Sequence, residues 1–162
     1  MKTLVVYYSL QGNTRLVARL VAEAAGADLL ELKPVEDVNP RGFMKYVRGG
    51  SQAVKRIVPE LEPVTVDPQD YDRLIIGSPV WAGTFAPAVR AFFQKYPPGD
   101  RQTAVFCTHR GGQGRALEKM QEQLDRGRVI GANGFSRVLR QDREKLAAFN
   151  GERYFFYHLE FR

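Results

Sequence analysis

Short apolar runs that alternate with helix-like stretches constrain the fold of this chain most strongly. Residues 4–8 are apolar at every position, and residues 73–77 and 102–108 are rich in apolar side chains. An unbroken apolar run is typical of a parallel strand that is buried on both faces. Residues 13–25 instead place their apolar side chains on one helical stripe, which Gly26 ends. This alternation predicts an α/β fold, a parallel sheet with helices on both faces.

The remaining segments continue the same alternation. Further strands are expected over residues 28–33 and 129–138, and further helices over residues 43–58, 84–96, 113–125 and 141–149. Five strands and five helices predict a doubly wound five-stranded parallel sheet, in a single domain that spans residues 1–162. The paired glycines at positions 49 and 50 fall inside the second of these helices, and the sequence offers no explanation for them.

The C-terminal residues 152–162 depart from this pattern. Large apolar side chains alternate there with more polar ones, at Phe155, Tyr157, Leu159 and Phe161. A period of two is typical of a strand. We expect a strand-like tail that either extends the edge of the same sheet or pairs with a second subunit, which would make the protein a homodimer.

The composition is that of a globular protein in a reducing compartment. The chain is 44% hydrophobic and 26% charged, and it contains a single cysteine, Cys107. One cysteine excludes an internal disulfide and fits the cytoplasm. No apolar run approaches the roughly 20 residues of a membrane span, and the first residues lack a signal-peptide pattern. We therefore expect a cytoplasmic protein without a membrane span.

The net charge of +6 is unevenly distributed along the chain. Residues 1–81 hold equal numbers of basic and acidic side chains, whereas residues 82–162 hold fourteen basic and eight acidic ones. A basic half could attract nucleic acid, anionic lipid or an acidic protein. The charges are scattered and mixed with acids, and no basic run of five occurs. A solvated surface is therefore favoured, and a nucleic-acid interface is not.

Three loops are expected at the carboxyl ends of the strands, where ligands of such sheets bind. The first loop, residues 9–15, has the chemistry of an anion site. Ser9 and Thr14 carry hydroxyl groups, Asn13 carries an amide, and Gly12 allows a tight turn. It lacks the Lys-Ser/Thr pair of triphosphate loops and the G-x-G-x-x-G of dinucleotide sites. The alternative is that Ser9 or Asn13 only caps the following helix.

The second and third loops supply different groups. Residues 78–85 contain the only tryptophan, Trp81, whose flat apolar face can stack on a planar ring; the alternative is an indole packed on the sheet edge. Residues 108–114 contain three glycines, which allow close backbone approach, and Arg110. A phosphorylated molecule with a planar ring fits all three loops. Flavin mononucleotide (FMN) is the cofactor that we expect.

Three stretches of the sequence together resemble the flavodoxin family over nearly the whole chain. They are "YYSLQGNTR", "DRLIIGSPVWAGTFAPAVRAFF" and "FCTHRGGQG". In the first, Ser9, Gly12 and Thr14 occupy the positions of the family's S/T-x-x-G-x-T phosphate loop. The resemblance implies the strand order 2-1-3-4-5, with FMN bound where the order reverses.

The resemblance also implies a role for each loop in binding FMN. The phosphate would be held by Ser9, Leu10, Gln11, Gly12, Asn13 and Thr14. The isoalloxazine would be lined by Ser78, Pro79, Val80, Trp81, Ala82, Gly83 and Thr84. Its pyrimidine side would be flanked by Thr108, His109, Arg110, Gly111, Gly112 and Gly114.

The implied function is electron transfer to or from a redox partner protein. FMN would carry the redox chemistry, so neither a catalytic side chain nor a metal is expected. One alternative is a small FMN-dependent NAD(P)H oxidoreductase of the quinone-reductase type. Another is an interaction domain that kept the fold and lost the flavin. The sequence departs from typical flavodoxins, which are acidic, because its pI is about 9.6.

Two rival chemistries are not supported by the residues. Low-molecular-weight tyrosine phosphatases need a C-x5-R loop, but Gln113 stands where the arginine would follow Cys107. Cys107 is therefore interpreted as a small core residue. His158 has no partner at the spacing of metal ligands, and no cluster of cysteine, histidine and carboxylate residues indicates a metal site. His109, in the third loop, either contacts the flavin or lies on the surface.

Overall fold

The computed structural model describes residues 1–38, 50–51, 53, 55–124, 128–136 and 138. The helix predicted over 141–149, the strand-like tail over 152–162 and most of the helix predicted over 43–58 lie outside these residues. The described part contains no helix that is long and apolar enough to cross a membrane.

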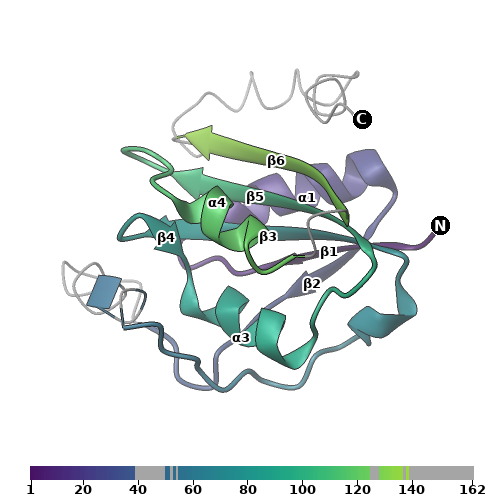
Figure 1. Cartoon of the computed structure of the whole chain (residues 1–162), viewed down its shortest axis with the longest axis horizontal. Coiled ribbons are helices and arrows are strands. Elements are labelled where there is room, and N and C mark those ends of the chain that lie inside the picture. Colours follow the sequence, from purple (N-terminus) through teal and green to yellow (C-terminus); the bar gives the residue numbers. More distant parts are fainter. Residues whose placement is uncertain (39–49, 52, 54, 125–127, 137, 139–162) are drawn as a thin grey trace.

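Five parallel strands form the centre of the molecule (Figure 1). They are β1 (Thr3–Tyr7), β2 (Asp28–Glu31), β3 (Arg73–Trp81), β5 (Gln102–His109) and β6 (Val129–Ser136). Their order across the sheet is β2-β1-β3-β5-β6, and the short strand β4 (Thr84–Phe85) pairs antiparallel with the end of β3. Counting the parallel strands alone, this order is the predicted 2-1-3-4-5.

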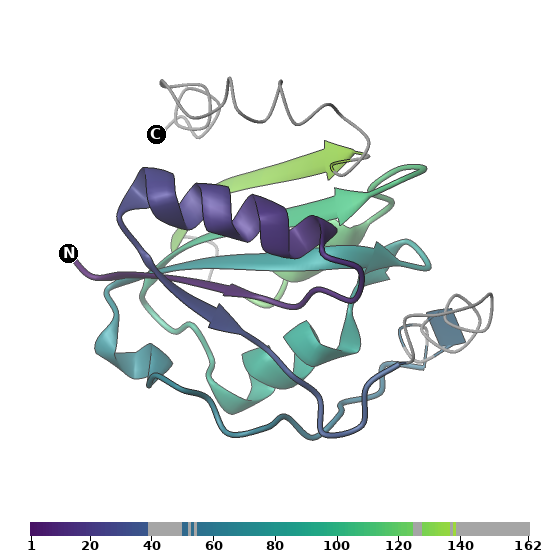
Figure 2. The same ribbon diagram turned by 180° about the vertical axis from the view of Figure 1, so that it is seen from behind.

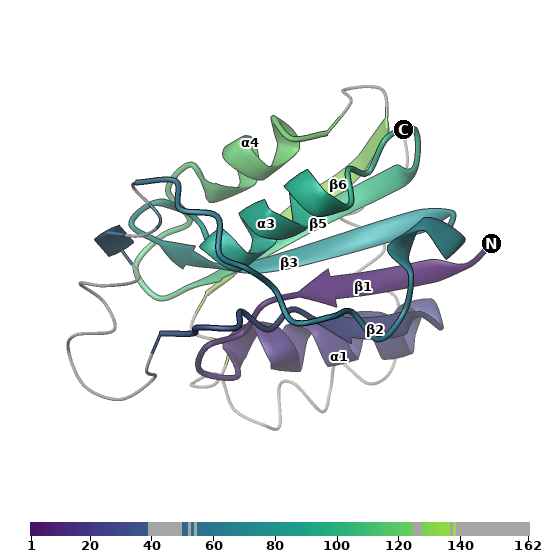
Figure 3. The ribbon, with the colours of Figure 1, turned by 90° about the horizontal axis from the view of Figure 1, so that it is seen from below.

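Helices cover both faces of the sheet. Helix α1 (Asn13–Ala25) lies on one face (Figure 2), while α3 (Pro87–Lys95) and α4 (Ala116–Gln121) lie on the other (Figure 3). A short 3-10 helix, η1 (Pro68–Asp70), precedes β3. Helix α1 has the predicted bounds and ends at Gly26, whose φ of 57° is left-handed. The predicted doubly wound α/β class is therefore confirmed.

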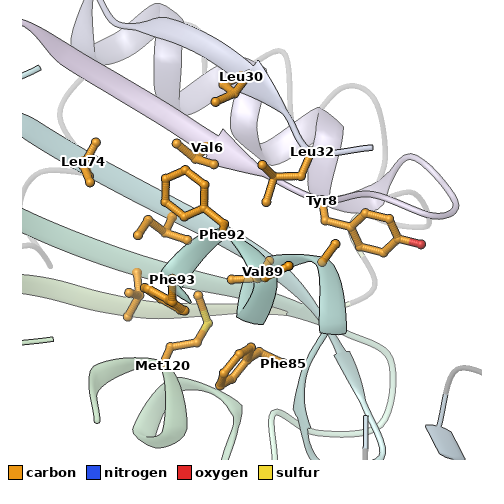
Figure 4. Packing of buried hydrophobic residues seen from close by; sticks show 14 of the residues in the cluster. Val6, Tyr8, Leu30, Leu32, Leu74, Phe85, Val89, Phe92, Phe93 and Met120 are labelled. Carbon is orange, nitrogen blue, oxygen red and sulfur yellow. The ribbon is translucent and has the colours of Figure 1, made fainter. Parts of the chain in front are cut away.

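Side chains of β1 pack into two hydrophobic clusters, one on each face of the sheet, because successive side chains along a strand point to opposite faces. Leu4 and Val6 pack with the α3 side, in a cluster that includes Phe92 (Figure 4). Val5 and Tyr7 pack with α1 on the opposite face. All four side chains are buried, which explains why this strand reads as one continuous apolar run.

The main corrections concern the segments that follow β3 and β5. The helix predicted over 84–96 begins only at Pro87, because Thr84 and Phe85 pair with the end of β3 and Ala86 is extended. The helix predicted over 113–125 is shorter and begins at Ala116. Its predicted first residues include Gly114, which has a left-handed φ of 52° and cannot continue a helix.

Candidate functional site

A pocket of about 390 Å³ opens where β1, β3 and β5 end. Its position is the point where the strand order reverses, which is the usual ligand site of an open α/β sheet. The lining comes from all three predicted loops and from one further residue: Ser9, Leu10, Gln11, Asn13, Thr14, Gly50, Pro79, Val80, Trp81, Ala82, Thr108, His109, Arg110, Gly111 and Gly112. The described lining therefore contains one arginine and no carboxylate.

The loop after β1 is organised around the hydroxyl of Ser9. Ser9 Oγ accepts the N–H groups of Gly12, at 3.1 Å, and Arg15, at 3.2 Å. These bonds satisfy two of the four N–H groups that a helix N-terminus leaves without intrahelical acceptors. The N–H of Thr14 belongs to the same first turn and can donate to an anion. Gly12 supports the turn with a left-handed φ of 92°.

Thr14 also joins the first loop to the third. Its Oγ1 lies 2.8 Å from Thr108 Oγ1, and both side chains are buried. Only one of the two hydroxyl hydrogens is needed for this bond, so the other hydrogen can be donated to a ligand. The bond holds the start of α1 against the end of β5, on the two sides of the pocket.

Trp81 forms the aromatic wall and is itself supported from behind. Its ring meets that of Tyr8 edge-on, with centroids 5.6 Å apart and an interplanar angle of 83°. Tyr8 is buried, and its hydroxyl donates to Asp37 at 2.6 Å. Burial, and then the Asp37 carboxylate, raise the pKa of Tyr8. The phenol therefore stays protonated as the donor that fixes this wall.

Ala82 and Gly83 form a two-residue turn between β3 and β4. Both have a left-handed φ, 49° and 72° respectively, as a tight hairpin turn requires. Ser78 braces the hairpin from inside, because its Oγ accepts the Ala86 N–H at 2.9 Å. The turn thus places Ala82 in the pocket lining.

The third loop folds back on itself through His109. The Nδ1 of His109 accepts the N–H of Gly112 at 3.1 Å, and Gly112 has a φ of 136° that favours glycine. The imidazole therefore has an unprotonated Nδ1 in this arrangement. The bond closes residues 109–112 into a turn whose backbone lines the pocket.

Fourteen of the nineteen predicted site residues line the pocket. The other five are not part of the lining: Gly12, Ser78, Gly83, Thr84 and Gly114. Sequence reasoning missed Gly50, which lines the pocket through a segment that was predicted only as a helix. The glycine pair at 49–50 was the available signal, since a glycine inside a helix calls for a packing reason.

Cys107 takes no part in the pocket lining. Its side chain is buried, and burial raises the pKa of the thiol to about 12. A thiol that stays protonated is a poor nucleophile, in agreement with its interpretation as a core residue. Among the described residues, no group of three potential metal ligands lies together.

Comparisons with known proteins agree with this architecture. A flavoprotein from Lactobacillus acidophilus NCFM, solved in complex with FMN, is 25% identical; the match covers 93% of this chain and 99% of that chain, with a TM-score of 0.69. A structure assigned as a flavoprotein from Bacteroides uniformis ATCC 8492 is 21% identical (93% and 98% covered, TM-score 0.74). The flavodoxin of Megasphaera elsdenii is 15% identical (86% and 88% covered, TM-score 0.51).

The two matches below 25% identity show the shared fold. The family assignment comes from the sequence itself, because residues 2–133 match the protein family described as Flavodoxin. That stretch contains all three loops of the pocket. The chain belongs to the flavodoxin family.

Proposed function

We propose that this protein binds FMN in the three-loop pocket and transfers electrons to or from a redox partner protein. The observation that carries the proposal is the composition of the pocket. A helix N-terminus with buried hydroxyl groups, an indole wall and a glycine-rich backbone wall meet there, in a described lining that has no carboxylate. The Lactobacillus acidophilus flavoprotein, which was solved with FMN, supports the same cofactor.

The residues present fit the chemistry of FMN. Hydroxyl groups and helical N–H groups of residues 9–14 are donors suited to a phosphate dianion, which is favoured at a helix N-terminus. The indole of Trp81 offers a flat face to the isoalloxazine, and the glycine-rich loop of residues 108–112 allows the backbone to approach its polar edge closely. When bound, FMN supplies the redox chemistry. The protein binds and orients the cofactor and limits its contact with water.

The partner is proposed to be a protein with an acidic surface. The net charge of +6 favours association with a negatively charged partner and disfavours association between like molecules. The rate of electron transfer to such a partner should therefore fall as ionic strength rises, because salt screens the attraction. We further propose that the protein works in the cytoplasm, since its single cysteine is a buried free thiol.

One experiment separates an electron carrier from an NAD(P)H oxidoreductase. The FMN-loaded protein is mixed anaerobically with NADH or NADPH, and flavin absorbance near 450 nm is followed. A carrier keeps its absorbance until a partner reductase is added. Rapid bleaching by either nucleotide alone would instead identify a reductase. A colourless protein that takes up no added FMN would favour a flavin-free interaction domain.

A further inference from the structure

The β3–β4 turn forms one wall of the pocket, and two glycines from other parts of the chain lie against it. The turn consists of Ala82 and Gly83, of which Ala82 lines the pocket. Gly114 approaches the turn from the loop after β5, and Gly50 from the described residues 50–51, which lie beside the β3–β4 end of the sheet (Figures 1 and 3). Two segments that are distant in sequence therefore contact the turn, one at Gly83 and the other at Ala82.

Gly114 makes the closer of the two approaches. A Cβ at this position would lie 2.7 Å from Gly83 Cα and 2.9 Å from Gly83 O, well inside van der Waals contact. Both are backbone atoms, so no rotamer change could make room. The N–H of Arg115 donates to the same Gly83 carbonyl at 2.9 Å. Only a residue without a side chain lets this hydrogen bond form.

Gly50 completes the contact from the other side. A Cβ at Gly50 would lie 3.7 Å from Ala82 Cβ, which is ordinary van der Waals contact. Gly50 belongs to the pocket lining as well. Because an added Cβ would make only an ordinary contact, packing against Ala82 does not by itself require a glycine at this position.

We propose that Gly114 is a positioning residue, which acts through the Gly83 carbonyl to hold the Ala82 wall at the spacing that the bound flavin requires. This inference rests on the proposed FMN function and assigns part of its affinity to a residue that does not line the pocket. A wall that is fixed before the ligand arrives removes an ordering cost from binding. In this structure, the hydrogen bond from the Arg115 N–H to the Gly83 carbonyl fixes the turn before a ligand binds.

The test compares two glycine-to-alanine variants with nearly the same backbone conformation. Gly114→Ala introduces the contact with Gly83 at a φ of 52°. Gly99→Ala is the matched control, because Gly99 has a φ of 57° and no atom within 4 Å of an added Cβ, and it precedes the amino end of β5, whereas the pocket lies at the carboxyl ends of the strands. For each variant, the Kd for FMN and the reduction potential of bound FMN are measured.

We expect Gly114→Ala to weaken FMN binding by about tenfold or more and to shift the reduction potential. Gly99→Ala should leave the Kd within about twofold of the wild-type value and the reduction potential unchanged within error. Equal Kd and potential in the two variants would overturn the inference and leave the FMN function standing. A wild-type protein that takes up no FMN would overturn both.

A second measurement uses the wild-type protein and does not depend on how the variants fold. Hydrogen exchange of the Arg115 N–H is followed in the FMN-free protein. If the turn is held before the ligand binds, this amide exchanges far more slowly than an open loop amide. Exchange at the rate of an unprotected amide would show that the contact forms only with the ligand, and would overturn the proposal.

Discussion

Gly77 illustrates how a single residue leaves room for a large side chain on the neighbouring strand. A Cβ at Gly77 in β3 would lie 2.1 Å from Cζ of the Phe106 ring in β5. That ring is buried and meets Phe135 edge-on, with centroids 6.1 Å apart, so a shift of the ring would disturb its packing in the core. The glycine is therefore required for packing, although its backbone conformation would suit other residues.

We predict that Gly77→Ala lowers the free energy of unfolding by about 1–3 kcal/mol, the usual cost of overpacking a core. Gly111→Ala is the control, since an added Cβ there meets nothing within 4 Å and its φ is not left-handed. Its change in stability should stay within about 0.5 kcal/mol. Urea denaturation measures both values, and equal stabilities would contradict the proposed contact with Phe106.

Tyr8 should make the stability of the protein depend on pH above about pH 10. Its pKa is raised in the folded state, so at high pH the unfolded chain releases this proton while the folded chain keeps it. Stability therefore falls as pH rises through the ordinary tyrosine pKa of about 10. In Tyr8→Phe the fall should be shallower, by up to about 1.4 kcal/mol per pH unit. Denaturation at several pH values compares the slopes, and identical slopes would contradict the role of Tyr8.

The elements show what the sequence can and cannot predict. Helix α1 has the predicted bounds because a helical stripe and the left-handed Gly26 both act locally. The β3–β4 hairpin was missed because it depends on contacts outside the turn itself: Ser78 Oγ accepts the Ala86 N–H across the hairpin, and Gly83 O accepts the N–H of Arg115 from the loop after β5. Of the five predicted site residues that do not line the pocket, Ser78 and Gly83 make these two contacts. The three loops that form the pocket were predicted from their residue types.

Helix α3 carries a half-buried charge that the described part of the chain leaves without a carboxylate partner. Arg90 lies over the ring of Phe85, 4.7 Å from its centroid, and its buried Nε has no hydrogen-bond partner among the described residues. Burial first, and then the charge of Arg56, lower the pKa of Arg90. Arg101 is half-buried too, but it donates to the carbonyls of Pro97, Pro98 and Pro68.

We therefore predict that replacement by methionine has different consequences at these two arginines. Arg90→Met should change the free energy of unfolding by no more than about 0.5 kcal/mol or raise it, because a partly desolvated cation is removed. Arg101→Met should lower it by about 1–3 kcal/mol, because three carbonyl bonds are lost. Thermal or urea denaturation distinguishes the two outcomes, and a larger loss for Arg90→Met than for Arg101→Met would be contrary to this account.

At the scale of the whole molecule, a basic protein surrounds the proposed flavin site. The net charge is +6, and Arg110 is the arginine of the described pocket lining. A positive charge near the cofactor favours its reduced, more negative form. The reduction potential should accordingly be less negative than that of an acidic family member.

Arg110→Gln should lower the reduction potential of bound FMN by an amount on the order of tens of millivolts, and less in high salt. Arg19→Gln is the matched control, because Arg19 is exposed on α1 outside the lining and its replacement removes the same net charge. Spectroelectrochemical titration gives both potentials. If the two variants have equal potentials, the effect belongs to overall charge and not to the position of Arg110.

The central claim is that the three loops form one site for a phosphorylated flavin. It is tested most directly by titrating the FMN-free protein with FMN and with riboflavin, which lacks the phosphate, while the fluorescence of Trp81 and of the flavin is recorded. We predict one FMN bound per chain with quenching of both signals, and riboflavin binding weaker by about 100-fold or more, because several charge-assisted hydrogen bonds of about 1.5–3 kcal/mol each are absent. Equal affinity for the two flavins, or no uptake of FMN, would contradict the claim.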